Sequence, residues 1–598
     1  MDNQNKNNHI KELRIEMERR GVKYFTAVTS DAHDSEYICE HDNAVKYISG
    51  FTGTNGRLAV TADDARLWTD GRYFIQADDE LQGSGITLMK TGEPGVPGYK
   101  EWCESAGIDP TARIIRENDD AGRNTAQAGN ADSDAPDREK ASDDIAKRKA
   151  CDDSLYELII DIIWPDRPAR PANPLWIHDI RWAGRTAREK TELVRQVMQE
   201  RGLKEIFINA LDDIAWLLNL RGSDIPYNPV FYSFLHIADT ITIYLQPASL
   251  SPQIEEYLKN LNIKIADYAD FADSDANRNR LAEGQPFSTV VADIKTHKSA
   301  DELQHMRECG LRDGVYMTKF IYWIKKRMQE ASDFPDEINA SDHLDALRAG
   351  DPYYVSLSFP TISAYGPDAA IVHYEAKQES CRTLKPQGLY LVDCGGQYLD
   401  GTTDVTRTIA LGPLTEEEKT HYTLVCIGML RVLNRKFTLP LNSSIIDECA
   451  REMLRANELD FNHGAGHGIG FLGYVHEGPA RISRSQNKEQ KQTLKSPQQS
   501  ASKAVNTVPV YKFTGNEITS DEPGVYIEGS HGVRIENLIA VGDREFECLT
   551  WVPLETEAID FSLMTEEDKN NFENYQAEVK TRISPFLTDD ERRWLNEI

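Results

Sequence analysis

The chain has 598 residues, more than one hydrophobic core normally supports, so we expect two to four domains. Its formal net charge of -30 and isoelectric point near 4.9 argue against nucleic acids and anionic membranes as partners, because both require clustered Lys and Arg. No apolar run approaches the roughly 18 residues that span a bilayer, and MDNQNKNNHI at the start lacks an apolar signal core. We therefore expect a cytoplasmic protein with nine reduced cysteines.

The first predicted domain, residues 1–163, is of the α/β class. In GRLAVTADDARLWTDGRYFIQA, strands at 57–60 and 65–68 flank an Asp-Asp turn, and a helix follows Thr69-Asp70-Gly71. Residues 118–153 are rich in Asp, Asn, Ala and Ser, so they bury too little apolar surface to offset the entropy of ordering. We expect a mobile segment there, followed by a helix at 155–163.

The second predicted domain, residues 164–296, opens on the proline-rich stretch WPDRPARPANP. An apolar helical stretch ending in glycine, DDIAWLLNLRG, precedes two strands around an Ala-Asp turn in HIADTITIYL. YISGFTG and LAVTADDARLWTD follow the same order in the first domain. The repetition predicts a duplicated α/β domain.

The third predicted domain, residues 297–598, is of the α+β class. Capping boxes at Ser299–Glu302 and Thr415–Glu418 predict the starts of two long helices. Between and after these helices lie strands that alternate polar and apolar residues. Residues 483–503 are rich in Gln, Ser and Lys and of low complexity, which predicts a polar loop insertion.

Two strand motifs in this domain carry carboxylates. In LYLVDCGGQYLDGTTDVTRTIAL, Asp393 ends an apolar strand, and period-two alternation sets Asp404 on one face of the next strand with two threonines. In DEPGVYIEGSHGVRIENLIAV, Glu522 precedes a Pro-Gly turn, and Glu536 lies within an apolar strand where an unpaired carboxylate is costly. Taken singly, the aspartates are explained as solvated turn residues, and Glu536 as an ion-pair partner of Arg534.

Gathered in one site, four carboxylates would repel one another strongly unless a counter-charge were present. Oxygen-rich ligands with one imidazole suit a pair of divalent ions, for which Mn²⁺ is favoured and Co²⁺ or Zn²⁺ are alternatives.

The stretch HGAGHGIGFLGYVHEGP, from His463, can supply the imidazole. Ile469 occupies the place of the third glycine of a dinucleotide fingerprint, and HGAGH lacks the glutamate of HExxH. Glycines around histidines allow the backbone to pass close to a ligand site. Each histidine taken singly also fits an ordinary polar or core position.

Together these motifs resemble the pita-bread metallopeptidases (the creatinase, prolidase and methionine aminopeptidase group), specifically the long, three-domain aminopeptidase P type. The resemblance implies two creatinase-N-terminal-like α/β domains followed by a pita-bread catalytic domain. It rests on five motifs in the right order: SGFTGTNG with LWTDGRYF, TISAYGPDAAIVHY, VDCGGQYLDGTTDVTRT, HGAGHGIG with VHEGP, and DEPGVYIEGSHGVRIEN.

By this resemblance, two divalent metal ions are held by Asp393, Asp404, His467, Glu522 and Glu536. Asp404 and Glu536 are expected to bridge the ions. The catalytic and substrate-binding residues it implies are His373, His476, His463, Glu522 and Arg72.

The activity implied is that of an Xaa-Pro aminopeptidase, which hydrolyses the bond before a proline in the second position of a peptide by means of metal-activated hydroxide. A homodimer acting on proline-containing peptides is expected. The alternatives are an Xaa-Pro dipeptidase (prolidase), which the duplicated N-terminal region argues against, and a non-catalytic peptide-binding pita-bread module, which the five intact ligands argue against.

Overall fold

The computed structural model describes residues 3–116, 152–282, 284–330, 333–484 and 510–598. It divides into one unit of Met1–His178 with Thr186–Val291, and a second of Asp179–Arg185 with Ala292–Ile598. The polar segments expected at 118–153 and 483–503 lie almost wholly outside the described residues. Of the helices within the described ranges, none combines the length and apolar character that a membrane crossing needs.

The first unit begins with a five-stranded sheet in the order β4-β3-β2-β1-β5. One face carries a core formed with helices α1, α2, α3 and the helix at 152–163, and the other packs against α4. The bounds are α1 Asn3–Arg19, β1 Val22–Val28, α2 Ala44–Ser49, β2 Gly56–Thr61, β3 Ala65–Thr69, α3 Phe74–Glu80, β4 Thr87–Lys90, α4 Tyr99–Ser105 and β5 Ile114–Arg116.

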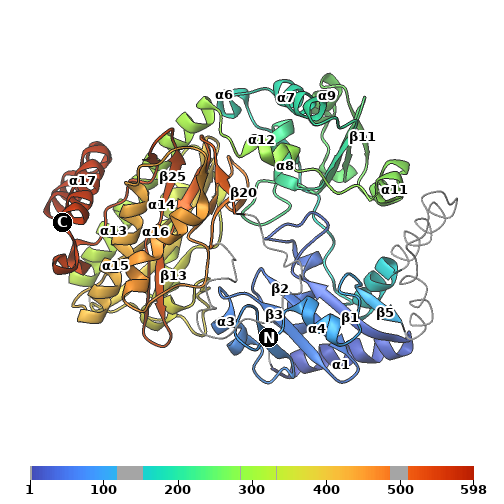
Figure 1. Cartoon of the computed structure of the whole chain (residues 1–598), viewed down its shortest axis with the longest axis horizontal. Helices are drawn as coiled ribbons and strands as arrows, with labels where there is room; N and C mark the ends of the chain where they lie inside the picture. Colours follow the sequence, from blue (N-terminus) through green and yellow to red (C-terminus); the bar gives the residue numbers. More distant parts are fainter. Residues whose placement is uncertain (1–2, 117–151, 283, 331–332, 485–509) are drawn as a thin grey trace, which may run out of the picture. The chain divides into compact units, whose positions relative to one another are not determined.

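A four-stranded sheet in the order β11-β10-β9-β7 follows in the same unit (Figure 1). Its one parallel pair, β10 with β11, corresponds to the parallel pair β3 with β4, and the remaining neighbours in both sheets are antiparallel. The duplication expected from the sequence is therefore confirmed as a repeat of topology. The bounds are α7 Ala187–Glu200, β7 Ile206–Ile208, α8 Leu211–Leu218, β9 Ser233–Ile237, β10 Ile241–Leu245, α9 Pro252–Asn260 and β11 Ile263–Asp267.

Two antiparallel sheets of the second unit are each backed by their own helices (Figure 1). The sheet β13-β14-β17 shares a core with α13 and α14, and the sheet β20-β19-β22-β25-β26 shares one with α15, α16 and α17. Both predicted capping boxes are present, at Ser299 before α13 and at Thr415 before α15.

The helices of this unit are α13 Ala300–Glu330, α14 Glu337–Ala349, α15 Glu416–Leu433, α16 Ser443–Ala456, α17 Glu566–Ile583 and α18 Asp589–Glu597. Its principal strands are β12 Tyr354–Leu357, β13 Ile362–Tyr365, β14 Leu389–Cys394, β15 Gly396–Tyr398, β16 Gly401–Thr402, β17 Val405–Ala410, β19 Gly466–Gly468, β20 Glu477–Ile482, β22 Ile518–Asp521, β23 Gly524–Ile527, β24 His531–Arg534, β25 Asn537–Val541 and β26 Phe546–Cys548.

Alternation along β14 determines which side chains face the helices. Tyr390, Val392 and Cys394 belong to the core shared with α13 and α14, whereas Leu391 belongs to a separate cluster on the opposite face. Asp393 therefore points away from the helices, on the same face as Leu391. All six residues of the strand are buried because both faces are covered.

A buried ion pair fixes α14 against α13 beneath this sheet. The Arg348 guanidinium, which is fully buried, donates to both carboxylate oxygens of Asp313 at 2.7 and 3.1 Å. The Tyr398 hydroxyl donates to the same carboxylate at 2.7 Å. With these donors the buried charge of Asp313 is compensated, whereas removing the guanidinium would leave it with one neutral donor.

We expect Arg348→Met to lower the free energy of unfolding of this unit by about 3–5 kcal/mol, because it leaves a buried carboxylate without its counter-charge. Hydrogen exchange of the β14 amides measures that free energy directly. Arg307→Met, which removes a solvent-exposed pair with Glu547, is the matched control and should change it by less than about 1 kcal/mol. Equal effects of the two variants would contradict the assignment.

Candidate metal centre

Two of the predicted ligands come from adjacent strands of the β13-β14-β17 sheet. Asp393 lies near the end of β14, and Asp404 immediately precedes β17. The strands pair in antiparallel register with Asp393 opposite Thr406, which brings the two carboxylates together. An oxygen atom from each of Asp393, Asp404 and Glu536 lies within 4.8 Å of the other two. The approach of Asp393 to Asp404 expected from the sequence is thus confirmed.

The other three predicted ligands lie on or beside strands of the sheet β20-β19-β22-β25-β26. His467 is the middle residue of β19, Glu522 directly follows β22, and Glu536 lies between β24 and β25. The prediction that Glu536 sits inside a strand was therefore wrong in detail: the pairing of β24 with β23 ends at Arg534, and that of β25 with β22 begins at Asn537. In the intervening stretch the Glu536 amide donates to the Thr406 carbonyl at 3.1 Å, which links the two sheets.

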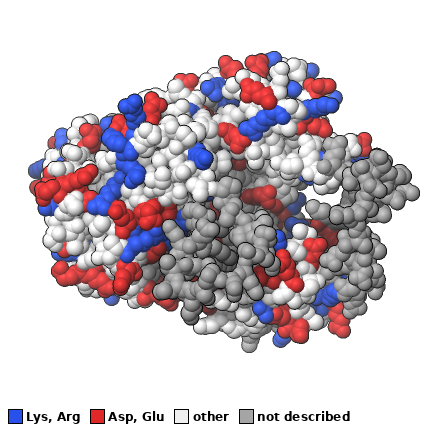
Figure 2. All heavy atoms as spheres, in the orientation of Figure 1, with Lys and Arg blue, Asp and Glu red and all other residues white. Residues whose placement is uncertain are grey.

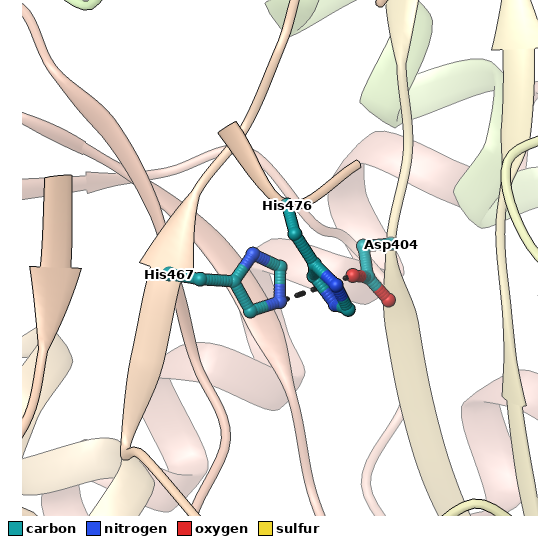
Figure 3. Close-up of side chains that lie close together, drawn as sticks. All are labelled: Asp404, His467 and His476. Atoms are coloured by element: carbon teal, nitrogen blue, oxygen red, sulfur yellow. Dashed lines mark ion pairs between the residues drawn. The ribbon is translucent and has the colours of Figure 1, made fainter. Parts of the chain in front are cut away.

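His467 sits between carboxylates of both sheets. Its Nε2 atom lies 3.5 Å from Asp404 Oδ2 and 3.5 Å from Glu522 Oε1. Ligand atoms of His467, Glu522 and Glu536 form a second group within 4.8 Å of one another, and those of Asp404, His467 and His476 form a third. Figure 3 shows both imidazole rings beside the Asp404 carboxylate. The ring centroids of His467 and His476 are 4.2 Å apart, and the ring planes are inclined at 77°.

Burial and mutual repulsion both disfavour the ionised forms of these carboxylates. The pKa of Asp404 is raised far above its usual range, first by burial and then by the charge of Asp393. Burial likewise raises the pKa of Glu536, with a further increase from Asp404, and it raises the pKa of Glu522 to about 7. Each of these shifts marks a place where added positive charge would be stabilising.

The arrangement fits divalent cations. Among the described residues, Asp393 Oδ1 and Glu536 Oε1 are buried and have no hydrogen-bond partner, although a buried polar oxygen is normally satisfied. Both belong to the groups whose ligand atoms converge. Unpaired carboxylate oxygens beside one imidazole make a donor set suited to hard or borderline ions such as Mn²⁺.

The second carboxylate oxygen of Asp393 and that of Glu536 are each held by a hydrogen bond from the protein. Arg534 donates to Asp393 Oδ2 at 2.6 Å, and the Thr406 hydroxyl donates to Glu536 Oε2 at 2.7 Å. The ion pair considered for Arg534 is therefore made with Asp393, and Glu536 is held by the threonine that alternation placed on the face of Asp404. Since each carboxylate keeps one oxygen bound and one unsatisfied, its orientation is set in advance.

Arg407, within β17, is a buried residue that the sequence analysis did not assign to the site. Its buried guanidinium donates to the carbonyls of Thr406 and Glu536 at 2.8 and 2.7 Å, and to Asn537 Oδ1 at 2.8 Å. It thereby joins β17 of one sheet to the start of β25 in the other. An arginine among the apolar residues of a buried strand was the sequence signal that could have identified it.

The other predicted histidines lie in the same unit. His463 is 6% exposed and is fixed by the Tyr526 hydroxyl at Nε2, 2.8 Å away, with Nδ1 at 3.7 Å from Glu522 Oε2. His373 is partly exposed, and the carbonyl before it, that of Val372, accepts a hydrogen bond from Arg534 at 3.4 Å. His476 adjoins the carboxylates as described above.

Glu477, next to His476, is not among the converging ligands. Its carboxylate pairs with Lys298 and, at 3.3 Å, with Lys295, and all three side chains are buried. Opposite it in the pairing of β20 with β19 lies Gly468, the neighbour of His467. The ion pairs therefore fix the strand start that follows His476.

Arg72 belongs to the first unit. Its guanidinium donates to both oxygens of Asp70, at 3.0 and 2.9 Å, and to Glu36 Oε1 at 3.1 Å. Its role in substrate binding stays a prediction from the resemblance.

The family profiles match along almost the whole chain. Residues 10–116 and 166–309 each match a Creatinase/Prolidase N-terminal domain, residues 304–543 match metallopeptidase family M24, and residues 544–598 match the C-terminal region of peptidase M24. The expected fold class, two creatinase-type α/β domains followed by a pita-bread domain, is confirmed.

Relatives of known name match end to end. Probable Xaa-Pro aminopeptidase P of Pyricularia oryzae is 34% identical over 97% of this chain and 96% of its own length. The protein of the same name from Coccidioides posadasii is 34% identical over 98% of both chains. A solved structure, the X-prolyl aminopeptidase of Caenorhabditis elegans, described as a cytosolic enzyme with a di-nuclear active site, matches with a TM-score of 0.81 and 28% identity, covering 98% of this chain and 99% of that chain. The chain belongs to the Xaa-Pro aminopeptidase P family of M24 metallopeptidases.

Proposed function

We propose that this chain is a metal-dependent aminopeptidase that removes the N-terminal residue from peptides with proline in the second position. The observation that carries the proposal is the convergence of five ligand residues from two sheets, with unsatisfied buried oxygens among them, in a chain similar over its full length to Xaa-Pro aminopeptidase P proteins. The ligand residues are Asp393, Asp404, His467, Glu522 and Glu536.

In the proposed centre, two divalent ions would be held by the five ligand residues, with Asp404 and Glu536 shared between the ions, Asp393 as a ligand of one, and His467 with Glu522 as ligands of the other. Asp404, Glu536 and His467 each belong to two of the groups of converging atoms, and of these three residues only the two carboxylates have a second oxygen to offer a second ion. When bound, such a pair of ions supplies Lewis acidity and lowers the pKa of a shared water toward neutrality. The oxygen-rich donor set favours Mn²⁺.

The protein's own groups provide orientation and proton transfer. Glu522 accepts the proton of the attacking water. His373 and His476 donate hydrogen bonds to the substrate carbonyl as negative charge develops on it, and His463 lines the pocket. The bond cleaved is a tertiary amide without an N–H, so recognition depends on a fit to the proline ring rather than on backbone pairing.

The two alternatives are less well supported. The full-length similarity to Xaa-Pro aminopeptidase P proteins, together with the duplicated N-terminal topology, favours an aminopeptidase over an Xaa-Pro dipeptidase. All five ligand residues are present and converge, which disfavours a module that binds peptides without cleaving them.

Further properties complete the proposal. We place the domains at 1–163, 164–296 and 297–598, assign Arg72 to substrate contact, and propose a cytoplasmic homodimer that binds neither nucleic acid nor membranes. The description of the nematode relative as cytosolic supports the location. On the face shown in Figure 2, the basic residues among those described are interspersed with acidic ones. This distribution and the net charge of -30 are both unfavourable for binding nucleic acids or anionic membranes.

The central test is hydrolysis of Xaa-Pro-Yaa peptides against matched Xaa-Ala-Yaa peptides. We expect cleavage of the proline series only, its loss on dialysis against a chelator, and its return with added Mn²⁺, because the attacking water depends on bound cations. Release of the first residue is measured by chromatography. Equal cleavage of the alanine series, or indifference to the chelator, would refute the proposal.

Asp404→Asn should affect stability with opposite signs in the absence and presence of metal. In chelator it removes a carboxyl group whose ionised form is disfavoured first by burial and then by the charge of Asp393, so we expect the melting temperature to rise by about 2 °C or more. With Mn²⁺ at 100 times its Kd, the wild type should gain about 2.7 kcal/mol and the variant little. Asp342→Asn, at an exposed site, is the control that should change neither value. A variant less stable than wild type in chelator would contradict the repulsion argument.

Metal affinity should fall in acid. The raised pKa of Glu522, about 7, means that the metal-free protein holds a proton there below neutrality, and a metal ligand must release it. We expect Mn²⁺ affinity to fall on the order of tenfold between pH 7.5 and 5.5. Calorimetry in two buffers of different ionisation enthalpy would reveal the released proton, and a pH-independent affinity would show that Glu522 does not bind the metal.

A further inference from the structure

A buried carboxylate outside the metal centre collects hydrogen bonds from the segment that carries His373. Glu337, at the start of α14, is fully buried. Its Oε1 accepts the Tyr365 amide at 2.7 Å, and its Oε2 accepts the Tyr374 hydroxyl and the Arg382 amide, each at 2.9 Å. A buried carboxylate is costly unless it is satisfied, so these three donors and Glu337 depend on one another.

The three donor residues lie along one segment of the chain, residues 365–382, within the connection from β13 to β14. Tyr365 is the last residue of β13, Arg382 is at the other end of the segment, and Tyr374 lies between them. Glu337 and Arg382 each donate to the other: the Arg382 amide donates to the Glu337 carboxylate, and the Glu337 amide donates to the Arg382 carbonyl at 3.0 Å. Glu337 thus holds both ends and the middle of the 365–382 segment.

The same segment is held from its other side by β24. Arg534 donates to the Val372 carbonyl at 3.4 Å and to Asp393 Oδ2 at 2.6 Å. Gly532 lies so close to the segment that a Cβ atom there would be 1.8 Å from the Ala369 carbonyl oxygen. The residues on either side of His373 are therefore both fixed, Val372 toward the metal centre and Tyr374 toward Glu337.

We infer that Glu337 and Tyr374 are positioning residues that set the placement of His373 toward the substrate, an inference that rests on the proposed function. Tyr374 is 9% exposed and its hydroxyl fixes the position immediately after His373, whereas His373 itself is partly exposed. Positioning of a hydrogen-bond donor matters most where charge develops in the transition state.

The test compares Tyr374→Phe with Tyr316→Phe. Each variant deletes one tyrosine hydroxyl that donates to a carboxylate in the same unit, but Tyr316 donates to Asp351, at 3.1 Å, in a part of the unit that does not hold His373. In hydrolysis of an Xaa-Pro-Yaa peptide by the full, Mn²⁺-loaded chain, Tyr374→Phe should lower kcat about tenfold with little change in KM. Tyr316→Phe should match the wild type, and Mn²⁺ content should be unchanged in both variants.

A double-mutant cycle separates positioning from a general structural effect. In a His373→Ala background, Tyr374→Phe should cause no further loss of kcat, because its effect passes through the absent imidazole. Glu337→Gln keeps the volume and one acceptor oxygen, so it serves as a second variant if Tyr374→Phe fails to fold, and it should lower kcat in the same direction.

Three outcomes would overturn the inference. Tyr374→Phe or Glu337→Gln could leave kcat at the level of the Tyr316→Phe control, or Tyr374→Phe could lower kcat equally with and without His373. If the wild type is active, either result rejects the positioning role and leaves the proposed function standing. A Mn²⁺-loaded wild type that fails to cleave the proline peptide rejects the proposed function, and the inference with it.

Discussion

The second unit is organised around the cost of burying several carboxylates in one place. Asp393, Asp404 and Glu536 are buried with ligand oxygens within 4.8 Å of one another, and burial together with repulsion raises the pKa of Asp404 and of Glu536. One protein cation, Arg534, offsets part of that charge through Asp393. The remainder suits bound cations, and the fold tolerates the cluster because other buried interactions hold its strands.

Those interactions mostly cross between the two sheets. Arg407 donates to the Thr406 and Glu536 carbonyls, and the Glu536 amide returns a hydrogen bond to Thr406. The buried Arg407 guanidinium therefore joins the strand that follows Asp404 to the connection that carries Glu536 through neutral acceptors. The ligand set thus depends in part on a residue that donates to no ligand side chain.

Sequence patterns predicted the parts of the site that follow from local periodicity. Alternation set Asp404 and Thr406 on one face of β17, and the apolar run ending at Asp393 predicted a buried strand, because both patterns depend on neighbours only a few residues away. The partner of Arg534 could not be chosen in this way, since Asp393 is 141 residues distant along the chain. Glu337 illustrates the same limit. In the sequence it is an acidic residue at the start of a helix, and its role depends on hydrogen-bond donors at residues 365, 374 and 382, which local patterns do not connect with it.

Close approach of backbones explains the glycines that surround the histidines. A Cβ atom at Gly466 would lie 2.1 Å from the Ser520 carbonyl oxygen, and one at Gly468 would lie 2.3 Å from that of Glu477. His467 stands between these two positions, so the strand that presents it is pressed against β22 on one side and β20 on the other. A side chain at Gly466 would push β19 away from β22, and so the imidazole away from Glu522, the ligand that follows β22. The glycine-rich stretch is thus required by the short distance between ligand-bearing strands, and its partial match to a dinucleotide fingerprint is incidental.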